Sequence, residues 1–332
     1  MFIPQTYQAA LLLMILSMIC WGSWANTLKL APGFRFQLFY WDYVIGLAAG
    51  AVLWGLTAGS MGSSGVPFLD AVRRTPREAI VYAICGGIIF NIANLLLVAA
   101  IDVAGLAVAF PVGIGLALIV GAVSSYLVHP AANPLLLFGG VALVTVAIIL
   151  DAAAYRRREQ NARATTTRGI VLSLVAGLLM GSFYPLVAHA MSVPGPGLSP
   201  GPYAVALFFA LGVLLSTVPA NLALMARPLD GKPPVSLNGY WSAPFGWHIA
   251  GWVGGAIWAT GAIANFVASQ TNLVGPAVSY SIGQGATMVS AFWGVFIWGE
   301  FSGSPPGAKL LLFYMFVFFL LGLGAIAIAP LH

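Results

Sequence analysis

The chain has 332 residues, of which 60% are hydrophobic and only 6% are charged, and its mean hydropathy is +0.96. Soluble domains carry roughly a quarter charged residues, so this composition excludes a water-soluble globular protein. The apolar runs are continuous rather than alternating, which also argues against a transmembrane β-barrel. We interpret the net charge of +5 as a set of topology signals. The sequence therefore predicts an all-α integral membrane protein.

Proline, glycine and charge clusters divide the apolar sequence into ten predicted transmembrane helices. Each span must be helical, because lipid offers the backbone no hydrogen-bond partners. Ten helices of about 20 to 25 residues occupy about 200 to 250 residues, which leaves short loops and no room for a sizeable soluble domain. We expect the first span to be retained, because Met1–Thr6 carries no basic residue. The predicted spans are 6–29, 36–59, 77–101, 104–128, 133–154, 168–191, 202–226, 247–271, 275–298 and 308–330.

Basic residues in short loops set the orientation of a membrane protein, because they remain on the cytoplasmic side. If both termini are outside, ten of the thirteen Lys and Arg residues fall in cytoplasmic loops, and only Arg73, Arg74 and Arg77 fall outside. The opposite orientation reverses this ratio. We therefore expect a multi-pass protein of the cell inner membrane with both termini periplasmic. The ten residues are Lys29, Arg35, Arg156, Arg157, Arg158, Arg163, Arg168, Arg227, Lys232 and Lys309.

One segment of the chain recurs, since 105–115 (GLAVAFPVGIG) matches 275–285 (GPAVSYSIGQG) at five identical positions. Gly22-Ser23-Trp24 is likewise echoed by Gly181-Ser182-Phe183. Each copy occupies the same ordinal helix of a five-helix half, and an odd number of spans gives the second half the opposite orientation. Such inverted repeats are typical of secondary transporters, with the substrate site near the midplane. The alternative is a chance match among 39 glycines. The predicted domains are a first repeat over 1–155, a cytoplasmic basic linker over 156–168 and a second repeat over 169–332.

Four motifs point to a known family: Gly22-Ser23-Trp24, Tyr40-Trp41-Asp42-Tyr43, Ala93-Asn94, and Phe292-Trp293-Gly294 through Gly299-Glu300. The first two resemble the Gly-Thr-Trp and Tyr-Leu-Asp-Tyr motifs of plant ureide permeases. Asn94 resembles the Asn of a Gly-Asn step shared by ureide permeases and the L-rhamnose–proton symporter, with Ala in place of Gly. The last motif is similar to the end of the ninth helix in these proteins. The chain thus resembles the ureide permease and glucose, ribose and rhamnose sugar-porter branches of the drug/metabolite transporter superfamily.

The resemblance implies a secondary active transporter that imports a small uncharged polar metabolite, commonly with protons, through ten helices. One position departs from the pattern. Where ureide permeases repeat the Gly-Asn step in the eighth helix, this chain has Gly261-Ala262, and its nearest amide is Asn265; Gln270 still looks similar. The substrate is therefore left open between a sugar and a ureide or nucleobase. The alternative function within the same superfamily is export of a metabolite or drug, for which a less polar pocket is expected.

Polar side chains inside membrane spans are unfavourable and mark candidate functional positions. Amides both donate and accept hydrogen bonds, which suits sugar hydroxyls or the amide edges of a ureide or nucleobase. Tryptophan faces can stack on either ligand. The alternative is that the amides bond to neighbouring helices and that the tryptophans belong to an interfacial belt. The predicted substrate-binding residues are Trp21, Trp24, Asn91, Asn94, Trp258, Asn265, Gln270, Tyr280 and Gln284.

Asp42 is the carboxylate that lies well within a predicted span. Burial between Tyr40, Trp41 and Tyr43 would disfavour its charged form and allow it to bind and release a proton. We therefore predict Asp42 as the proton-coupling residue. The alternative is that Asp42 is simply stabilised by the dipole at the N-terminal turn of its helix.

The sequence contains no pattern typical of a catalytic or metal site. Its four histidines, His129, His189, His248 and His332, are scattered, and Cys20 and Cys85 lie within apolar runs. An integral-membrane enzyme would need clustered catalytic groups or metal ligands. We expect no enzyme activity, no cofactor, no metal and no nucleic-acid partner. The expected partners are a small neutral polar substrate, a proton as coupling ion and membrane lipid, with the protein a monomer or a dimer.

Overall fold

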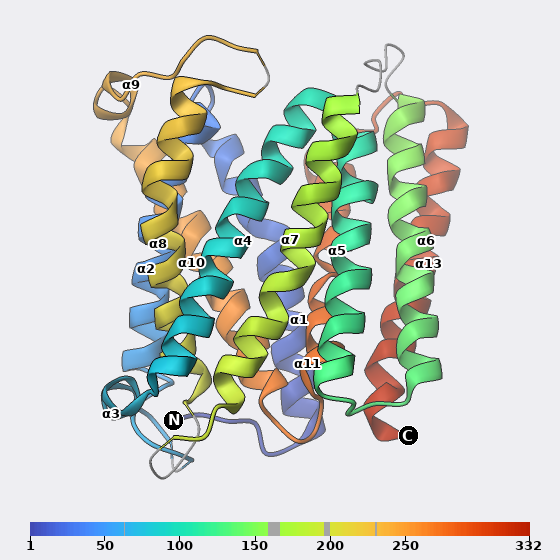
Figure 1. The fold of residues 1–332 in the computed structure, drawn as a ribbon. Helices are drawn as coiled ribbons and strands as arrows, with labels where there is room; N and C mark the ends of the chain where they lie inside the picture. Colours follow the sequence, from blue (N-terminus) through green and yellow to red (C-terminus); the bar gives the residue numbers. More distant parts are fainter. Residues whose placement is uncertain (63, 159–166, 196–199, 230) are drawn as a thin grey trace.

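The computed structural model describes residues 1–62, 64–158, 167–195, 200–229 and 231–332. Within these ranges the chain is helical and contains no strand. Long helices run side by side, and both termini lie at the same end of the molecule (Figure 1). We call this end the terminal face and the opposite end the basic face. Arg163 and most of the linker predicted over 156–168 lie outside the described residues.

Nine helices in the described part of the chain are long and apolar enough to cross a membrane. The short helices α3 (Phe68–Arg74) and α9 (Asn238–Trp241) lie in the connections, and the sequence did not predict them. The 3-10 helix η1 (Trp24–Leu30) continues α1, so the first span runs from Tyr7 to Leu30. The long helices are α1 (Tyr7–Ser23), α2 (Phe36–Leu56), α4 (Arg77–Ala104), α5 (Leu106–Val128), α6 (Pro134–Arg158), α7 (Thr167–Ser192), α8 (Pro202–Ala226), α10 (Phe245–Ser269) and α13 (Pro306–Ile328).

The segment predicted as one helix over 275–298 is broken in the structure into α11 (Pro276–Gly283), α12 (Ala286–Phe292) and a π-helical turn η2 (Trp293–Ile297). At the break, the N–H of Gly285 donates to the carbonyl of Ile282 at 2.9 Å, and the N–H of Thr287 donates to that of Gln284 at 3.2 Å. These are tighter turns than those of an α-helix. Glycine lowers the stability of a helix interior, which accounts for an interruption at Gly285.

The π-helical turn directs two indole groups toward the first span. Trp293 Nε1 donates to Ser23 Oγ at 2.9 Å, and Trp298 Nε1 donates to Asn26 Oδ1 at 2.6 Å. The two tryptophans are five residues apart. The wider π turn therefore holds the end of this segment against η1.

Helices α2 and α10 cross at two glycines that leave no room for a side chain. A Cβ added to Gly46 of α2 would meet the backbone carbonyl of Trp252, and one added to Gly255 of α10 would meet the carbonyl of Tyr43. Small residues let membrane helices approach this closely. The crossing therefore requires glycine at both positions.

Helices α4 and α8 cross in the same way. A Cβ added to Gly87 of α4 would meet the carbonyl of Phe209, and one added to Gly212 of α8 would meet the carbonyl of Ile84. In each of the four helices, the residue whose carbonyl makes the contact lies three positions before the glycine.

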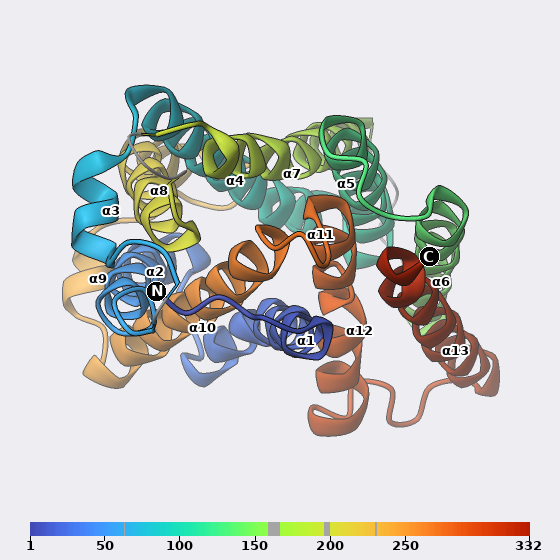
Figure 2. The same cartoon turned by 90° about the horizontal axis from the view of Figure 1, so that it is seen from below.

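The helices form two layers when the molecule is seen from the terminal face (Figure 2). One layer holds α4, α7 and α5, and the other holds α10, α1 and the α11–α12 segment. Helices α2 and α8 lie at one edge, and α6 and α13 pack together at the other. The space between the two layers is where a site between the halves is expected.

The α2–α10 crossing gives a direct test of the packing. Gly46→Ala should destabilise the protein by about 1–3 kcal/mol, because the new methyl group forces the two helices apart. Gly324→Ala in α13 is the matched control: a Cβ there has no atom within 4 Å, and the higher helix propensity of alanine should add up to about 1 kcal/mol. The measurement is thermal unfolding of the purified protein followed by tryptophan fluorescence. Equal stability of Gly46→Ala and the wild type would contradict this account of the crossing.

Candidate functional site

A cavity of about 280 Å³ lies between the two layers. It is lined by η1 and the end of α1, by the start of α2, by α4, α5, α7 and α10, and by the start of α12. Phe36, Ile101 and Phe110 lie at the ends of their helices that face away from the termini, so the cavity extends toward the basic face. Among the described residues that line it, none is charged. Its polar side chains are Asn94, Gln284, Thr287 and Ser290.

Aromatic rings form part of the cavity wall. Trp258 stacks on Phe209 with centroids 5.8 Å apart, and it lies 4.3 Å from the ring of Phe90. Trp21 also stacks on Trp258, with centroids 5.8 Å apart. This continuous stack fixes the orientation of the indoles, because each ring has a neighbour to rest on. The aromatic residues at the cavity are Trp21, Trp24, Phe36, Phe90, Phe110, Phe183 and Trp258.

Two glycines hold Trp21 in place. A Cβ on Gly261 of α10 would lie 2.8 Å from Trp21 Cδ1, and a Cβ on Gly283 of α11 would lie 2.7 Å from Trp21 Cζ3. The indole therefore occupies the space that two side chains would otherwise fill. Gly283 is one of the positions shared by the repeated segments, so this glycine has a packing role at the cavity.

Asn94 lines the cavity and is fixed by a chain of buried hydrogen bonds. Its Nδ2 donates to the hydroxyl of Tyr40 at 3.2 Å, and Tyr40 in turn donates to Asn91 Oδ1 at 2.8 Å. Asn91 Nδ2 donates to Ser216 Oγ at 2.9 Å, and Thr217 donates to Asn91 Oδ1 at 3.2 Å. Asn91 is fully buried and does not line the cavity, so it acts here as a support for Asn94.

The amide groups of the cavity retain free hydrogen-bonding capacity. Among the described residues, no side chain or carbonyl engages Asn94 Oδ1 or the side-chain amide of Gln284. Gln284 lies at the break between α11 and α12, which leaves its side chain at the cavity wall. The cavity therefore presents one free acceptor and one free amide to a ligand.

Asn265 and Tyr280 lie outside this cavity. The polar atoms of both side chains have hydrogen-bond partners. Asn265 Nδ2 donates to Ser17 Oγ at 3.1 Å and to the carbonyl of Ser279 at 2.9 Å. Asn265 Oδ1 accepts from Tyr184 and from Ser279 Oγ. The hydroxyl of Tyr280 donates to backbone carbonyls of α5 and α7. Both side chains therefore join helices in the structure.

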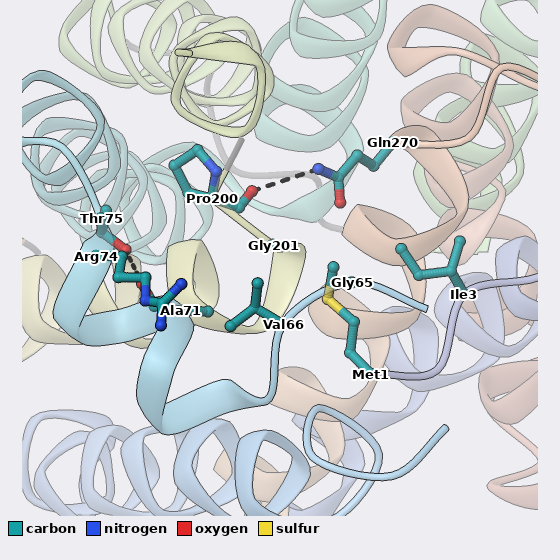
Figure 3. Close-up of a pocket in the computed structure, with 10 residues that line it drawn as sticks. All are labelled: Met1, Ile3, Gly65, Val66, Ala71, Arg74, Thr75, Pro200, Gly201 and Gln270. Atoms are coloured by element: carbon teal, nitrogen blue, oxygen red, sulfur yellow. Dashed lines mark hydrogen bonds between the residues drawn. The ribbon is translucent and has the colours of Figure 1, made fainter. Parts of the chain in front are cut away.

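Gln270 lies at the terminal face, away from the central cavity. Its Nε2 donates to the carbonyl of Pro200 at 3.3 Å, beside a pocket of about 240 Å³ that the N-terminal residues help to form (Figure 3). A second pocket of about 410 Å³ on the same face also contacts Gln270. Of the nine predicted substrate-binding residues, the structure brings five to the central cavity: Trp21, Trp24, Asn94, Trp258 and Gln284.

Asp42 is fully buried but does not line the cavity. Its Oδ1 accepts a hydrogen bond from the hydroxyl of Tyr240 at 2.7 Å, and its Oδ2 lies 2.8 Å from His248 Nδ1. A Cβ on Gly251 would overlap Asp42, so glycine is needed for this contact between α2 and α10. The expected burial is present, but the polar partners are Tyr240 and His248. Tyr240 lies in a connection outside the spans, where burial, and then the bond to Asp42, raise the pKa of its hydroxyl.

Glu300 forms the main ion-pair group at the basic face. It accepts from Lys29 Nζ at 2.7 Å, from Arg158 at 3.3 Å and from the hydroxyl of Tyr155 at 3.0 Å. Burial opposes ionisation of this carboxyl, but these partners outweigh it and lower its pKa. The charged groups are 26–43% exposed, so the ion pairs are screened and individually weak. They join η1 to α6, at the edge of the molecule.

The described residues contain no group of three His, Cys, Asp or Glu side chains placed to hold a metal ion. The model of the ureide permease family matches residues 39–168 and 155–329, which together make up most of the chain. The chain belongs to the ureide permease family. Members of this family are membrane transport proteins, so the chain is a transporter and not an enzyme.

Three similar ureide permeases come from Arabidopsis thaliana. Ureide permease 1 is 21% identical over 100% of both chains, and ureide permease 2 is 22% identical over 96% of each. Ureide permease 5 is 21% identical over 97% of this chain and 94% of its own length. A crystal structure of a protein that is 15% identical has a TM-score of 0.64 and covers 95% of this chain and 96% of that chain. At this identity the structural likeness shows the fold alone.

The sequence did not predict several residues of this cavity. Phe90, Val98 and Ile101 share a face of α4 with Asn94, at helical spacing, and a search outward from Asn94 along that face would have found them. Tyr240 and His248 had no such signal, because their contact with Asp42 depends on how the connection between α8 and α10 folds back.

Proposed function

We propose that this ureide permease family member is a secondary active transporter that imports a small uncharged polar metabolite, with a proton as coupling ion. The observation that carries the proposal is the central cavity, with aromatic walls, no charged lining residue among those described, and free amide groups on Asn94 and Gln284. A charged ligand would enter such a site without a counter-charge, which is strongly unfavourable. A neutral ligand with hydrogen-bonding edges fits it.

The cavity suits a ureide or nucleobase, whose amide edges pair with amide side chains and whose faces stack on the indoles. The names of the Arabidopsis relatives favour a ureide within this class. A sugar is the alternative, since its hydroxyls also pair with amides. The largely apolar wall is what favours the second candidate function, export of a metabolite by a member of the wider drug/metabolite transporter superfamily.

We also propose that 1–155 and 169–332 are inverted repeats, with the broken segment Pro276–Ile297 as the tenth span. The glycine crossings support this. Gly46 and Tyr43 of α2 are each 166 residues before Gly212 and Phe209 of α8, and Ile84 and Gly87 of α4 are each 168 residues before Trp252 and Gly255 of α10. Each contact in one crossing therefore has its counterpart in the other.

Two further pairs of matching positions extend this residue-by-residue correspondence between the halves, the register, to α1, α5, α7 and the α11–α12 segment. Gly105 precedes α5 with φ 79° and ψ 160°, and Gly275 precedes α11 with φ 78° and ψ 163°. Gly22 of α1 packs on Val289, and Gly181 of α7 packs on Val120. The halves then enclose the cavity between them, as in transporters that alternate between two open faces.

The orientation prediction follows from the distribution of basic residues. We expect the basic face to lie in the cytoplasm and both termini to lie in the periplasm. A reporter enzyme that is active only in the periplasm should therefore be active when fused after His332. Activity of a cytoplasm-specific reporter at the same position would overturn the orientation.

Asn94 is the residue that most directly tests the binding site. Asn94→Ala should weaken binding about 5- to 150-fold, because the ligand loses a hydrogen bond worth about 1–3 kcal/mol once buried. Asn221→Ala removes a buried amide of α8 that bonds to Gln37 and does not line the cavity, so it is the matched control. The measurement is a thermal-shift titration against ureides, nucleobases and sugars. Normal affinity and transport in both Asn94→Ala and Asn94→Leu would exclude Asn94 from the site.

Asp42 is the residue that tests whether proton binding is coupled to substrate import. Uphill import needs a group that binds and releases a proton during the cycle, and Asp42 is buried beside a histidine and a tyrosine. Asp42→Asn should therefore abolish accumulation against a gradient but retain substrate binding and exchange, whereas Asp70→Asn, at an exposed acidic residue of α3, should accumulate normally. Accumulation is measured in vesicles over a range of external pH and with a protonophore. Concentrative, pH-dependent uptake by Asp42→Asn would remove Asp42 from the mechanism.

A further inference from the structure

A layer of buried polar side chains lies on the terminal side of the central cavity. Asn265 is four residues before the end of α10, and Ser279 is three residues after the start of α11; both of these helix ends lie at the terminal face. Their bonds to Ser17 and Tyr184 join the four helices α1, α7, α10 and α11. All four side chains are fully buried.

A polar pocket lies on the other side of this layer. It has a volume of about 410 Å³ and is lined by residues that include His129, Ala188, Ser192, Ser269, Gln270 and Asn272. Ser269 is one helical turn beyond Asn265, so the layer separates this pocket from the central cavity. We call this pocket the vestibule.

We propose that Ser17, Tyr184, Asn265 and Ser279 form a gate between the central cavity and the vestibule, and that substrate passes through the vestibule when the gate opens. The inference rests on the proposed transport function and on the inverted repeat. In the described conformation the gate is closed, and the cavity extends to the basic face. Opening it requires these hydrogen bonds to break, because they tie α1 and α7, in opposite layers, to Asn265 of α10.

The counterpart positions on the basic side carry no polar side chain. In the register set by the glycine contacts, Asn265 corresponds to Leu97, and the contact of Gly283 with Asn265 corresponds to that of Gly113 with Leu97. The match of Gly22 with Gly181 pairs Ser17 with Ala176 and Tyr184 with Ala25. The match of Gly105 with Gly275 pairs Ser279 with Ala109. Leu97 and Ala25 line the cavity.

This asymmetry predicts a bias between the two conformations. Closing the terminal side makes a set of buried hydrogen bonds, whereas closing the basic side brings together alanine and leucine at the equivalent places. The conformation open to the basic face is therefore favoured in the absence of substrate. The ion pairs of Glu300 at the basic face do not offset this, because they join η1 to the peripheral helix α6.

The test compares the accessibility of two single cysteines in detergent, in a background where Cys20 and Cys85 are replaced by alanine. Val98→Cys reports on the central cavity, and Ala188→Cys reports on the vestibule. Tyr184→Phe removes one hydroxyl from the gate, and it should raise the ratio of Ala188→Cys to Val98→Cys labelling rates about 2- to 12-fold, the effect of one buried hydrogen bond. Asn265→Leu should raise the ratio further.

Tyr203→Phe is the matched control, because Tyr203 is a buried tyrosine of α8 whose hydroxyl bonds to the carbonyl of Phe2 outside the gate. It should leave the ratio unchanged. The gate is refuted if Tyr184→Phe and Asn265→Leu both give the wild-type ratio, or if Tyr203→Phe shifts it equally. These rates are measured without substrate. A protein that binds no ureide, nucleobase or sugar but shows the shift would therefore reject the proposed substrate class and keep the gate.

Discussion

Helices in a bilayer gain nothing from leaving lipid for one another, since lipid tails are as apolar as leucine, so their association depends on close packing and on internal hydrogen bonds. This chain meets that constraint with glycine. At the α2–α10 and α4–α8 crossings, backbone meets backbone with no side chain between them. The crossings join one helix of each layer, α10 and α4, to the edge helices α2 and α8. The aromatic stack around Trp258 lines part of the cavity.

Four amide side chains near the cavity divide into two kinds by what surrounds them. Asn91 and Asn265 have partners for both their donor and acceptor atoms, and each joins helices. Asn94 and Gln284 lie at the cavity and keep free atoms. A buried amide without partners is unfavourable, and the free atoms of Asn94 and Gln284 lie where a ligand or water can reach them; the buried oxygens Asn221 Oδ1 and Gln270 Oε1, outside the central cavity, also have no partner among the described residues. The same residue type thus stabilises the fold in one place and recognises a solute in another.

Hydropathy predicted the positions of the long helices well, because a membrane-spanning run of apolar residues has few alternatives. It did not predict which side of a helix faces the cavity. Asn91 and Asn94 are three residues apart on α4, yet only Asn94 reaches the cavity, since rotation of the helix about its axis is set by its neighbours. The break at Gln284 and the contact of Tyr240 with Asp42 also depend on tertiary structure. For this reason the aromatic and amide composition of the site was predictable, but only five of the nine predicted residues lie at the cavity.

The π-helical turn at Trp293–Ile297 has a geometric consequence for the last part of this segment. A residue in an α-helix advances the chain by about 100° around the helix axis, so side chains five residues apart normally point in clearly different directions. The wider turn brings Trp293 and Trp298 to the same side, where each bonds to the first span. The turn therefore sets the angle between the two indole groups, so that both hydrogen bonds join the end of the broken segment to the first span.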